Sequence, residues 1–151
     1  MKFYKSAKIA AAHCVDHNLI AVGTTRKVFK MGDYVVKQHI SPNGYEQSTK
    51  ECDFYNALPS HLQTWFARPY YVSPEYAIFE YVKPYEKGLD GNYYHTSFKD
   101  IISKEKHNNL ENFLRELELK TKEYAISFAK LITDLNVGVK RGEIKFVDYG
   151  N

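Results

Sequence analysis

The chain has 151 residues, enough for one domain with a substantial hydrophobic core but too few for the two full lobes of a large enzyme. Its 21 Lys and Arg residues and 18 Asp and Glu residues are interleaved, so the formal net charge of +3 comes without a basic tail or stripe. Proteins that bind the phosphate backbone usually concentrate their basic residues on one element, and this pattern therefore argues against nucleic-acid binding.

The first predicted elements are a helix and three strands. Residues 3–13 are rich in alanine and place apolar residues at helical spacing, which predicts a short helix. A strand in "NLIAVG" follows. Two more strands, Lys27–Met31 and Tyr34–Ile40, are joined by Gly32-Asp33 and predict a β-hairpin.

The stretch "HCVDH" gathers four side chains that can bind metals: His13, Cys14, Asp16 and His17. Metal sites rarely take all their ligands from five consecutive residues, so we interpret these as ordinary residues of a loop or helix end. The second cysteine, Cys52, is far away, and the chain has no CxxC pair. Such spacing is typical of a reduced, cytosolic protein.

A second helix is predicted over "YEQSTKECDFYNAL", after the break "SPNG" and before Pro59. Residues on one face of this helix share the spacing of a core-facing stripe: Ser48, Glu51, Cys52, Tyr55 and Leu58. We therefore expect Glu51 to point toward the core although it is an acid.

Two further strands are predicted in "ARPYYVS" and "YAIFEYV", separated by Pro74-Glu75 as in a hairpin. Five strands and one helix make a small α+β unit. In residues 83–107, "EKGLDGNYYH" is interpreted as a loop and "SFKDIISKE" as a short helix.

A long amphipathic helix is predicted from Asn108 onward. Its apolar face is traced by Leu110, Phe113, Leu114, Leu117, Tyr124, Ala125, Phe128, Ala129 and Ile132. The final segment, "VGVKRGEIKFVDYG", predicts a strand, an Arg-Gly turn and a second strand, with Asp148 directly after it.

No apolar run approaches the roughly 18 residues of a membrane span, and the N-terminus lacks the charged and then apolar pattern of a signal peptide. We therefore expect the protein to stay in the cytoplasm in which it is made, whether bacterial or that of a host.

Three features of this series come in an informative order. The strand "YVVK" ends in Lys37, the next helix has Glu51 on its inner face, and the last hairpin begins after Asn136 and ends at Asp148. In this order they resemble the protein kinase-like superfamily, most closely small bacterial and phage-type kinase-like proteins. The resemblance runs from about Val22 to the end of the sequence.

This resemblance implies a minimal kinase-like α+β fold in a single domain, residues 1–151. An N-terminal lobe of antiparallel sheet and one helix would extend to about residue 82. A linker and a reduced C-terminal lobe, made of a long helix and a β-hairpin, would occupy about 83–151.

The resemblance also implies roles for individual residues. Lys37 would hold the α and β phosphates of ATP, and Glu51 would pair with it, which would explain an acid on a core-facing stripe. Asn136 and Asp148 would be the ligands of Mg²⁺, which prefers oxygen donors.

Further positions match the family by their place in the chain. The backbone from Glu80 to Val82 in "FEYV" would meet the adenine. Gly23 begins the stretch that corresponds to the family's glycine-rich loop, and Arg26 in that stretch would add charge near the phosphates. Asp134 is the candidate catalytic base.

The sequence departs from the family pattern in three places. The loop GxGxxGxV has a single glycine here, Gly23. In the family form HRDLxxxN the base precedes the metal-binding Asn by five positions, whereas Asp134 precedes Asn136 by two, and no His stands before it. The sequence ends at Asn151, so we expect none of the segment that binds a protein substrate in the family.

Two functions stay open on these residues, and a third comes from composition alone. The first is a minimal kinase that binds ATP and Mg²⁺ and transfers phosphate to a hydroxyl of a protein or small molecule. The alternative is a catalytically inactive pseudokinase that inhibits or regulates a protein partner, for instance as a phage protein acting on host machinery. A homodimer is compatible with both, and a nucleic-acid-binding protein that uses Lys, Arg and Tyr is a third function.

The candidate site residues also have structural interpretations that involve no function. Lys37 alone is compatible with a solvated strand end, and Glu51 with a partly exposed helix position. Asp148-Tyr149-Gly150 alone is compatible with an ordinary turn.

Overall fold

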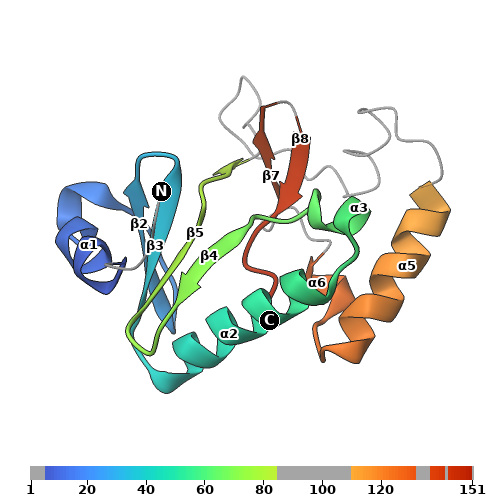
Figure 1. The fold of residues 1–151 in the computed structure, drawn as a ribbon, viewed down its shortest axis with the longest axis horizontal. Helices are drawn as coiled ribbons and strands as arrows, with labels where there is room; N and C mark the ends of the chain where they lie inside the picture. The colour runs from blue at the N-terminus through green and yellow to red at the C-terminus, as the bar shows by residue number, and fades with distance from the viewer. Residues whose placement is uncertain (1–5, 85–109, 132–136, 142, 151) are drawn as a thin grey trace. The chain divides into compact units, whose positions relative to one another are not determined.

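The computed structural model describes residues 6–84, 110–131, 137–141 and 143–150 (Figure 1). The chain divides into two compact units: residues 1–57, 67–81 and 150 form unit 1, and residues 58–66, 82–149 and 151 form unit 2. Each unit is described by itself. Whether the two units correspond to the two predicted lobes stays a prediction.

Unit 1 contains a five-stranded antiparallel sheet in the order β1-β2-β3-β5-β4. Its strands are β1 (Leu19–Val22), β2 (Arg26–Met31), β3 (Tyr34–His39), β4 (Pro69–Val72) and β5 (Tyr76–Glu80). The predicted α+β unit with five strands is confirmed. In the β2–β3 turn Gly32 has a φ of 59°, a backbone conformation that glycine adopts without steric cost.

The two faces of this sheet are covered by different helices (Figure 1). Helix α1 (Ser6–His13) packs on β2 and β5, and η1 (Asp16–Asn18) leads from it into β1. Helix α2 (Pro42–Ala57) packs on β3, β4 and β5. Because successive strand residues point to opposite faces, Val36 joins the apolar cluster with α1, while Lys37 points toward α2.

Helix α2 begins at Pro42, so the predicted start after "SPNG" was wrong. Proline is well suited to the first helical position, where no N–H is needed, and these residues form the first turn instead of a break.

The predicted inner face of α2 is correct at Ser48 and Glu51, both fully buried, and at Leu58 just beyond the helix. Cys52 and Tyr55 are only half-buried, and Phe54 is fully buried in their place. The buried face of α2 is therefore rotated slightly about the helix axis from the predicted one.

Unit 2 contains a three-stranded antiparallel sheet in the order β6-β7-β8, together with helices of 4 to 14 residues. Its elements are α3 (Ser60–Gln63), β6 (Lys83–Pro84), α5 (Leu110–Glu123), α6 (Phe128–Leu131), β7 (Val137–Lys140) and β8 (Glu143–Phe146). The predicted final hairpin is confirmed as β7–β8. Other than β6, the loop and short helix predicted in residues 83–107 lie outside the described residues.

Aromatic side chains form the centre of unit 2. The ring of Phe66 lies 5.2 Å from that of Phe146 and 5.0 Å from that of Tyr149, and all three residues are buried. The N–H of Phe146 donates to the carbonyl of Trp65 at 2.7 Å. Strand β8 is therefore fixed to the segment after α3 by both packing and backbone bonding.

The long helix predicted from Asn108 to Ile132 was wrong, because α5 ends at Glu123. Ala125 has a φ of 53°, and the Ile126 N–H donates to the Thr121 carbonyl at 2.9 Å. This backbone pattern ends helices, usually with glycine in the left-handed position.

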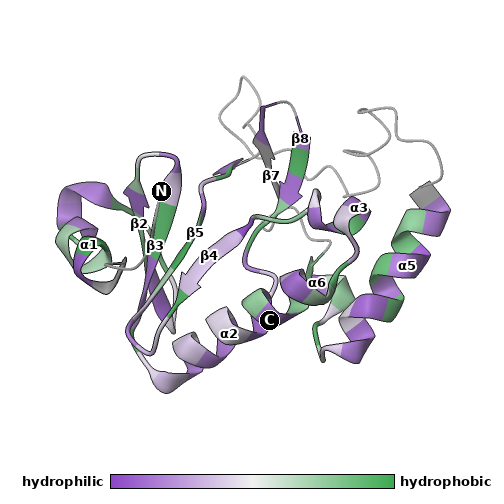
Figure 2. Cartoon of the chain, in the orientation of Figure 1, coloured by the Kyte–Doolittle hydropathy of each residue, from purple (hydrophilic) through white to green (hydrophobic). Residues whose placement is uncertain are grey.

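A separate short helix, α6, starts immediately afterward. The hydroxyl of Ser127 accepts a hydrogen bond from the Lys130 N–H at 3.3 Å and so caps the new helix. Figure 2 shows hydrophobic and hydrophilic residues alternating around α5, in agreement with the amphipathic pattern of its sequence. No helix in the described part of the chain is long and apolar enough to cross a membrane.

Candidate functional site

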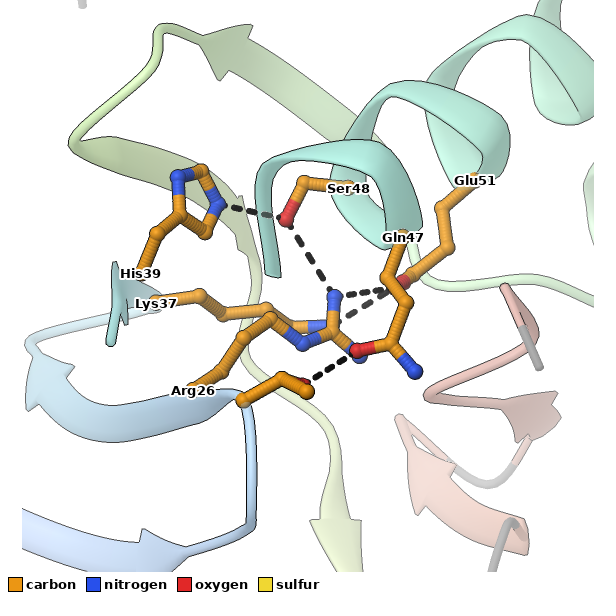
Figure 3. A network of polar contacts seen from close by, with 7 residues as sticks. Arg26, Lys37, His39, Gln47, Ser48 and Glu51 are labelled. Carbon is orange, nitrogen blue, oxygen red and sulfur yellow. Dashed lines mark hydrogen bonds and ion pairs between the residues drawn. The ribbon is translucent and has the colours of Figure 1, made fainter. Parts of the chain in front are cut away.

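The structure brings Lys37 and Glu51 together in unit 1 (Figure 3). The Lys37 Nζ lies 3.0 Å from the Glu51 Oε2, and the two side chains are only 5% and 0% exposed. The same ammonium lies 4.1 Å from the centre of the Phe79 ring, a favourable cation–π distance. The pair is therefore a buried, charge-assisted contact between strand β3 and helix α2.

Local structure explains why these two residues meet. Strand alternation points Lys37 toward α2, and helical periodicity points Glu51 toward the sheet. Helix α2 starts only three residues after β3 ends, so the connection leaves the helix next to the strand.

A third charged residue, Arg26, also contacts Glu51. Its Nη1 forms an ion pair with the Glu51 Oε1 and donates to the Ser48 hydroxyl at 3.3 Å. Arg26 is 7% exposed. In this structure its guanidinium is thus held inside unit 1, and a contact with phosphates stays a prediction.

Part of the signal for Arg26 was present in the sequence, because the predicted hairpin fixes which strand residues share a face. In the β2–β3 hairpin Val28 faces Lys37, and Arg26 is two residues before Val28 on the same strand. Residues two apart on a strand share a face, so the hairpin register placed Arg26 and Lys37 on the same side of the sheet.

His39 extends this network. Its Nε2 lies 2.7 Å from the Ser48 hydroxyl and its Nδ1 lies 2.9 Å from the Pro74 carbonyl (Figure 3). The carbonyl can only accept, so Nδ1 carries the proton and the neutral ring accepts from Ser48 through Nε2. Burial lowers the pKa of His39, and the positive charges of Arg26 and Lys37 lower it further.

The predicted phosphate loop forms a closed turn in unit 1. Gly23 is exposed, and its N–H donates to the Arg26 carbonyl at 2.8 Å. In this conformation the Gly23 amide is used within the turn.

The predicted adenine-binding segment crosses the boundary between the units, since unit 1 includes Tyr81 and unit 2 includes Val82. The Glu80 N–H donates to the Arg68 carbonyl at 2.8 Å, and its carboxylate accepts from the Arg68 N–H at 3.3 Å. Val82 is buried. The contact of this segment with adenine stays a prediction.

Asp148 belongs to unit 2 and is half-buried. Its φ of 52° places it in the left-handed region, which aspartate tolerates better than most residues and which often marks a functional position. Asp134 and Asn136, the predicted base and second metal ligand, lie outside the described residues.

Gly150 belongs to unit 1 and lies against α2. A Cβ atom added to it would come within 2.5 Å of the Gln47 carbonyl oxygen and 2.7 Å of the Glu51 Cγ. Only glycine fits so close to the helix backbone, and the last residue of "DYG" is therefore packed beside Glu51.

Residues 6–84, 110–131, 137–141 and 143–150 contain no group of three or more His, Cys, Asp or Glu side chains placed to hold a metal ion. The predicted Mg²⁺ site needs Asp148 together with Asn136, and only Asp148 is described. The Mg²⁺ site therefore stays a prediction.

The comparisons with known proteins give no family. No model of a protein family matches the chain, and no curated protein sequence is significantly similar to it. The kinase-like interpretation therefore depends on the residues and contacts described above.

Proposed function

We propose that the chain is a minimal kinase-like protein that binds ATP with Mg²⁺. The observation that carries this proposal is the buried pair of Lys37 and Glu51, with their charged atoms 3.0 Å apart. A lysine on the third strand paired with a glutamate on the following helix is the arrangement that holds nucleotide phosphates in the family the sequence resembles.

Energetics support a functional role for this pair. Moving charges out of water costs several kcal/mol per ion, and apolar replacements of buried ion pairs are often neutral or stabilising. An apolar pair would therefore have served stability equally well at these positions, whereas an ammonium fixed by a carboxylate is a ready contact for phosphate oxygens.

In the proposed reaction, Lys37 would hold the α and β phosphates and Glu51 would keep its ammonium in place. Bound Mg²⁺ would neutralise phosphate charge, with Asp148 and Asn136 as its ligands. Asp134 would accept the proton of the attacking hydroxyl, which belongs to a protein or small molecule.

A second candidate is a pseudokinase that binds nucleotide or a protein partner without catalysis, as an inhibitor or regulator of host machinery. Two observations favour it. The base and the metal ligand are separated by two positions instead of five, and the Gly23 amide is used within its own turn. In that case Lys37 and Glu51 would serve binding alone.

Thermal unfolding with and without Mg²⁺-ATP tests nucleotide binding. A ligand at a hundredfold excess over its Kd stabilises the folded state by about 2.7 kcal/mol. We expect this shift for the wild type, for the exposed-lysine control Lys27→Ala and for Asp134→Asn, but not for Lys37→Ala or Asp148→Ala. An unshifted wild type at millimolar ATP would contradict the proposal.

Catalysis is tested separately by ADP release from Mg²⁺-ATP, in which water attacks the γ-phosphate in place of the acceptor hydroxyl and ADP and inorganic phosphate are released. An active kinase loses ADP release in Asp134→Asn while keeping the thermal shift. A pseudokinase that binds nucleotide shows the thermal shift, but neither the wild type nor Asp134→Asn releases ADP.

A further inference from the structure

The carboxylate of Glu51 is shared by two cations in unit 1. Its Oε2 contacts the Lys37 ammonium and its Oε1 contacts the Arg26 guanidinium. Each carboxylate oxygen therefore has its own cation, and the carboxylate is fixed at two points instead of one. The Lys37 contact alone would leave the carboxylate able to rotate about its last bond.

Arg26 is itself held in a fixed position. The Ser48 hydroxyl accepts from its Nη1, and Ser48 is in turn bound to His39 (Figure 3). A planar guanidinium with several donors can bind both groups at once, which a lysine ammonium cannot do with the same geometry.

Helix α2 also makes room for Arg26. A Cβ atom on Gly44 would lie 2.4 Å from the Thr25 carbonyl oxygen and 3.1 Å from the Arg26 Cγ. The first turn of the helix can approach the Arg26 stem this closely only with glycine at position 44.

We propose that Arg26 is a positioning residue that fixes the Glu51 carboxylate and thereby presents its second oxygen to Lys37. This role differs from the phosphate contact that the sequence suggested for Arg26. Its consequence for nucleotide binding rests on the proposed function, but the positioning itself is a property of the ligand-free protein.

The test measures how fast a small acylating reagent, acetic anhydride, modifies Lys37 in the intact chain without nucleotide, read site by site by mass spectrometry. The reagent must reach the Lys37 nitrogen, so the contact with Glu51 inside unit 1, where the Lys37 side chain is only 5% exposed, protects it. In Arg26→Met we expect the rate of Lys37 modification to rise by about tenfold. This is the factor by which an equilibrium shifts when one charge-assisted hydrogen bond is lost.

If Arg26 does not position the carboxylate, Glu51 keeps its contact with Lys37 in Arg26→Met, and Lys37 stays protected. An unchanged or slower rate in folded Arg26→Met would therefore overturn the proposal. Lys27→Met removes an exposed charge from the next residue of the same strand and should leave the rate at Lys37 unchanged.

Two milder variants keep the proposal testable if Arg26→Met fails to fold. Ser48→Ala removes one acceptor of Arg26, and Arg26→Lys keeps the charge but loses the planar fork. Both should raise the modification of Lys37 by a smaller factor, and no rise in either variant would overturn the proposal.

Adding Mg²⁺-ATP to the same assay separates this proposal from the proposed function. If the variants expose Lys37 but ATP does not protect it in the wild type, positioning stands and nucleotide binding fails. If ATP protects Lys37 in the wild type and Arg26→Met leaves the rate unchanged, nucleotide binding stands and positioning fails.

Discussion

The two faces of the β1–β5 sheet bury different chemistry. The face under α1 holds an apolar cluster of Ala10, Phe29, Met31, Val36 and Ile78. The face under α2 also buries apolar residues, among them Val35, Ala77 and Phe79, but it adds the charged and polar side chains of Arg26, Lys37, Ser48 and Glu51.

This difference separates stability from function. Burial of apolar surface contributes roughly 25 cal/mol per Å², so the α1 face has a sufficient explanation in folding. On the α2 face the ions must first offset their own desolvation, and these ions contribute little net stability. Residues on the α2 face are therefore where a binding function is expected.

The largest effect should come from removing the carboxylate at the centre of the charged cluster on the α2 face. Glu51→Ala leaves two buried cations without their shared carboxylate, and loss of one partner of a buried pair costs about 3–5 kcal/mol. Urea unfolding measures the change. Glu46→Ala removes an exposed acid from the same helix and is the matched control; an equal loss in both variants would contradict the assignment.

The next effect concerns the approach of α2 to Thr25 and Arg26. Glycine to alanine inside a helix normally stabilises by about 0.5–1 kcal/mol. At Gly44 we expect the opposite sign, a loss of about 1–3 kcal/mol, because the added methyl overlaps the Thr25 carbonyl. Denaturant unfolding of Gly44→Ala decides the sign, and a gain in stability would show that the helix can move away.

A smaller effect is expected on the apolar face. Ile78→Val removes one buried methylene and should cost about 0.5–1.5 kcal/mol without changing the modification rate of Lys37. The two measurements are made on the same protein. A changed rate at Lys37 would mean that packing on the α1 face affects the charged residues of the α2 face, which would contradict their independence.

The smallest effect is the pH dependence due to His39, whose pKa is lowered by burial and by the nearby cations. In the unfolded state His39 has a pKa near 6.5 and binds a proton more readily than in the folded state. Stability is therefore lost as the pH falls below about 6.5 and is regained above it. His39→Gln should flatten this part of the curve of unfolding free energy against pH. An unchanged slope would contradict a neutral, half-buried His39 ring.

Much of unit 1 follows from local sequence patterns. Alternation predicted the strands, the hairpin turn was marked by Gly32, and the stripe of α2 placed Glu51 inward. The pairing of Lys37 with Glu51 was implied by the resemblance to kinase-like proteins, and the structure shows that their charged atoms lie 3.0 Å apart.

What the sequence did not predict depends on geometry over longer range. The contact of Arg26 with Glu51 joins residues 25 positions apart and requires the strand register as well as the helix position. The end of α5 was missed because alanine, instead of glycine, takes the left-handed position at Ala125. Pro42 was interpreted as a break because proline occurs both before helices and in their first turn.

The most direct test of the account is covalent. An acyl phosphate derivative of ATP transfers its acyl group to a lysine amine that lies beside the bound phosphates, and mass spectrometry identifies the lysine. We predict selective modification of Lys37 that excess Mg²⁺-ATP blocks, while exposed Lys27 reacts slowly and without competition. If Lys37 in the folded protein reacts no faster than Lys27 and ATP has no effect, the buried pair does not bind nucleotide.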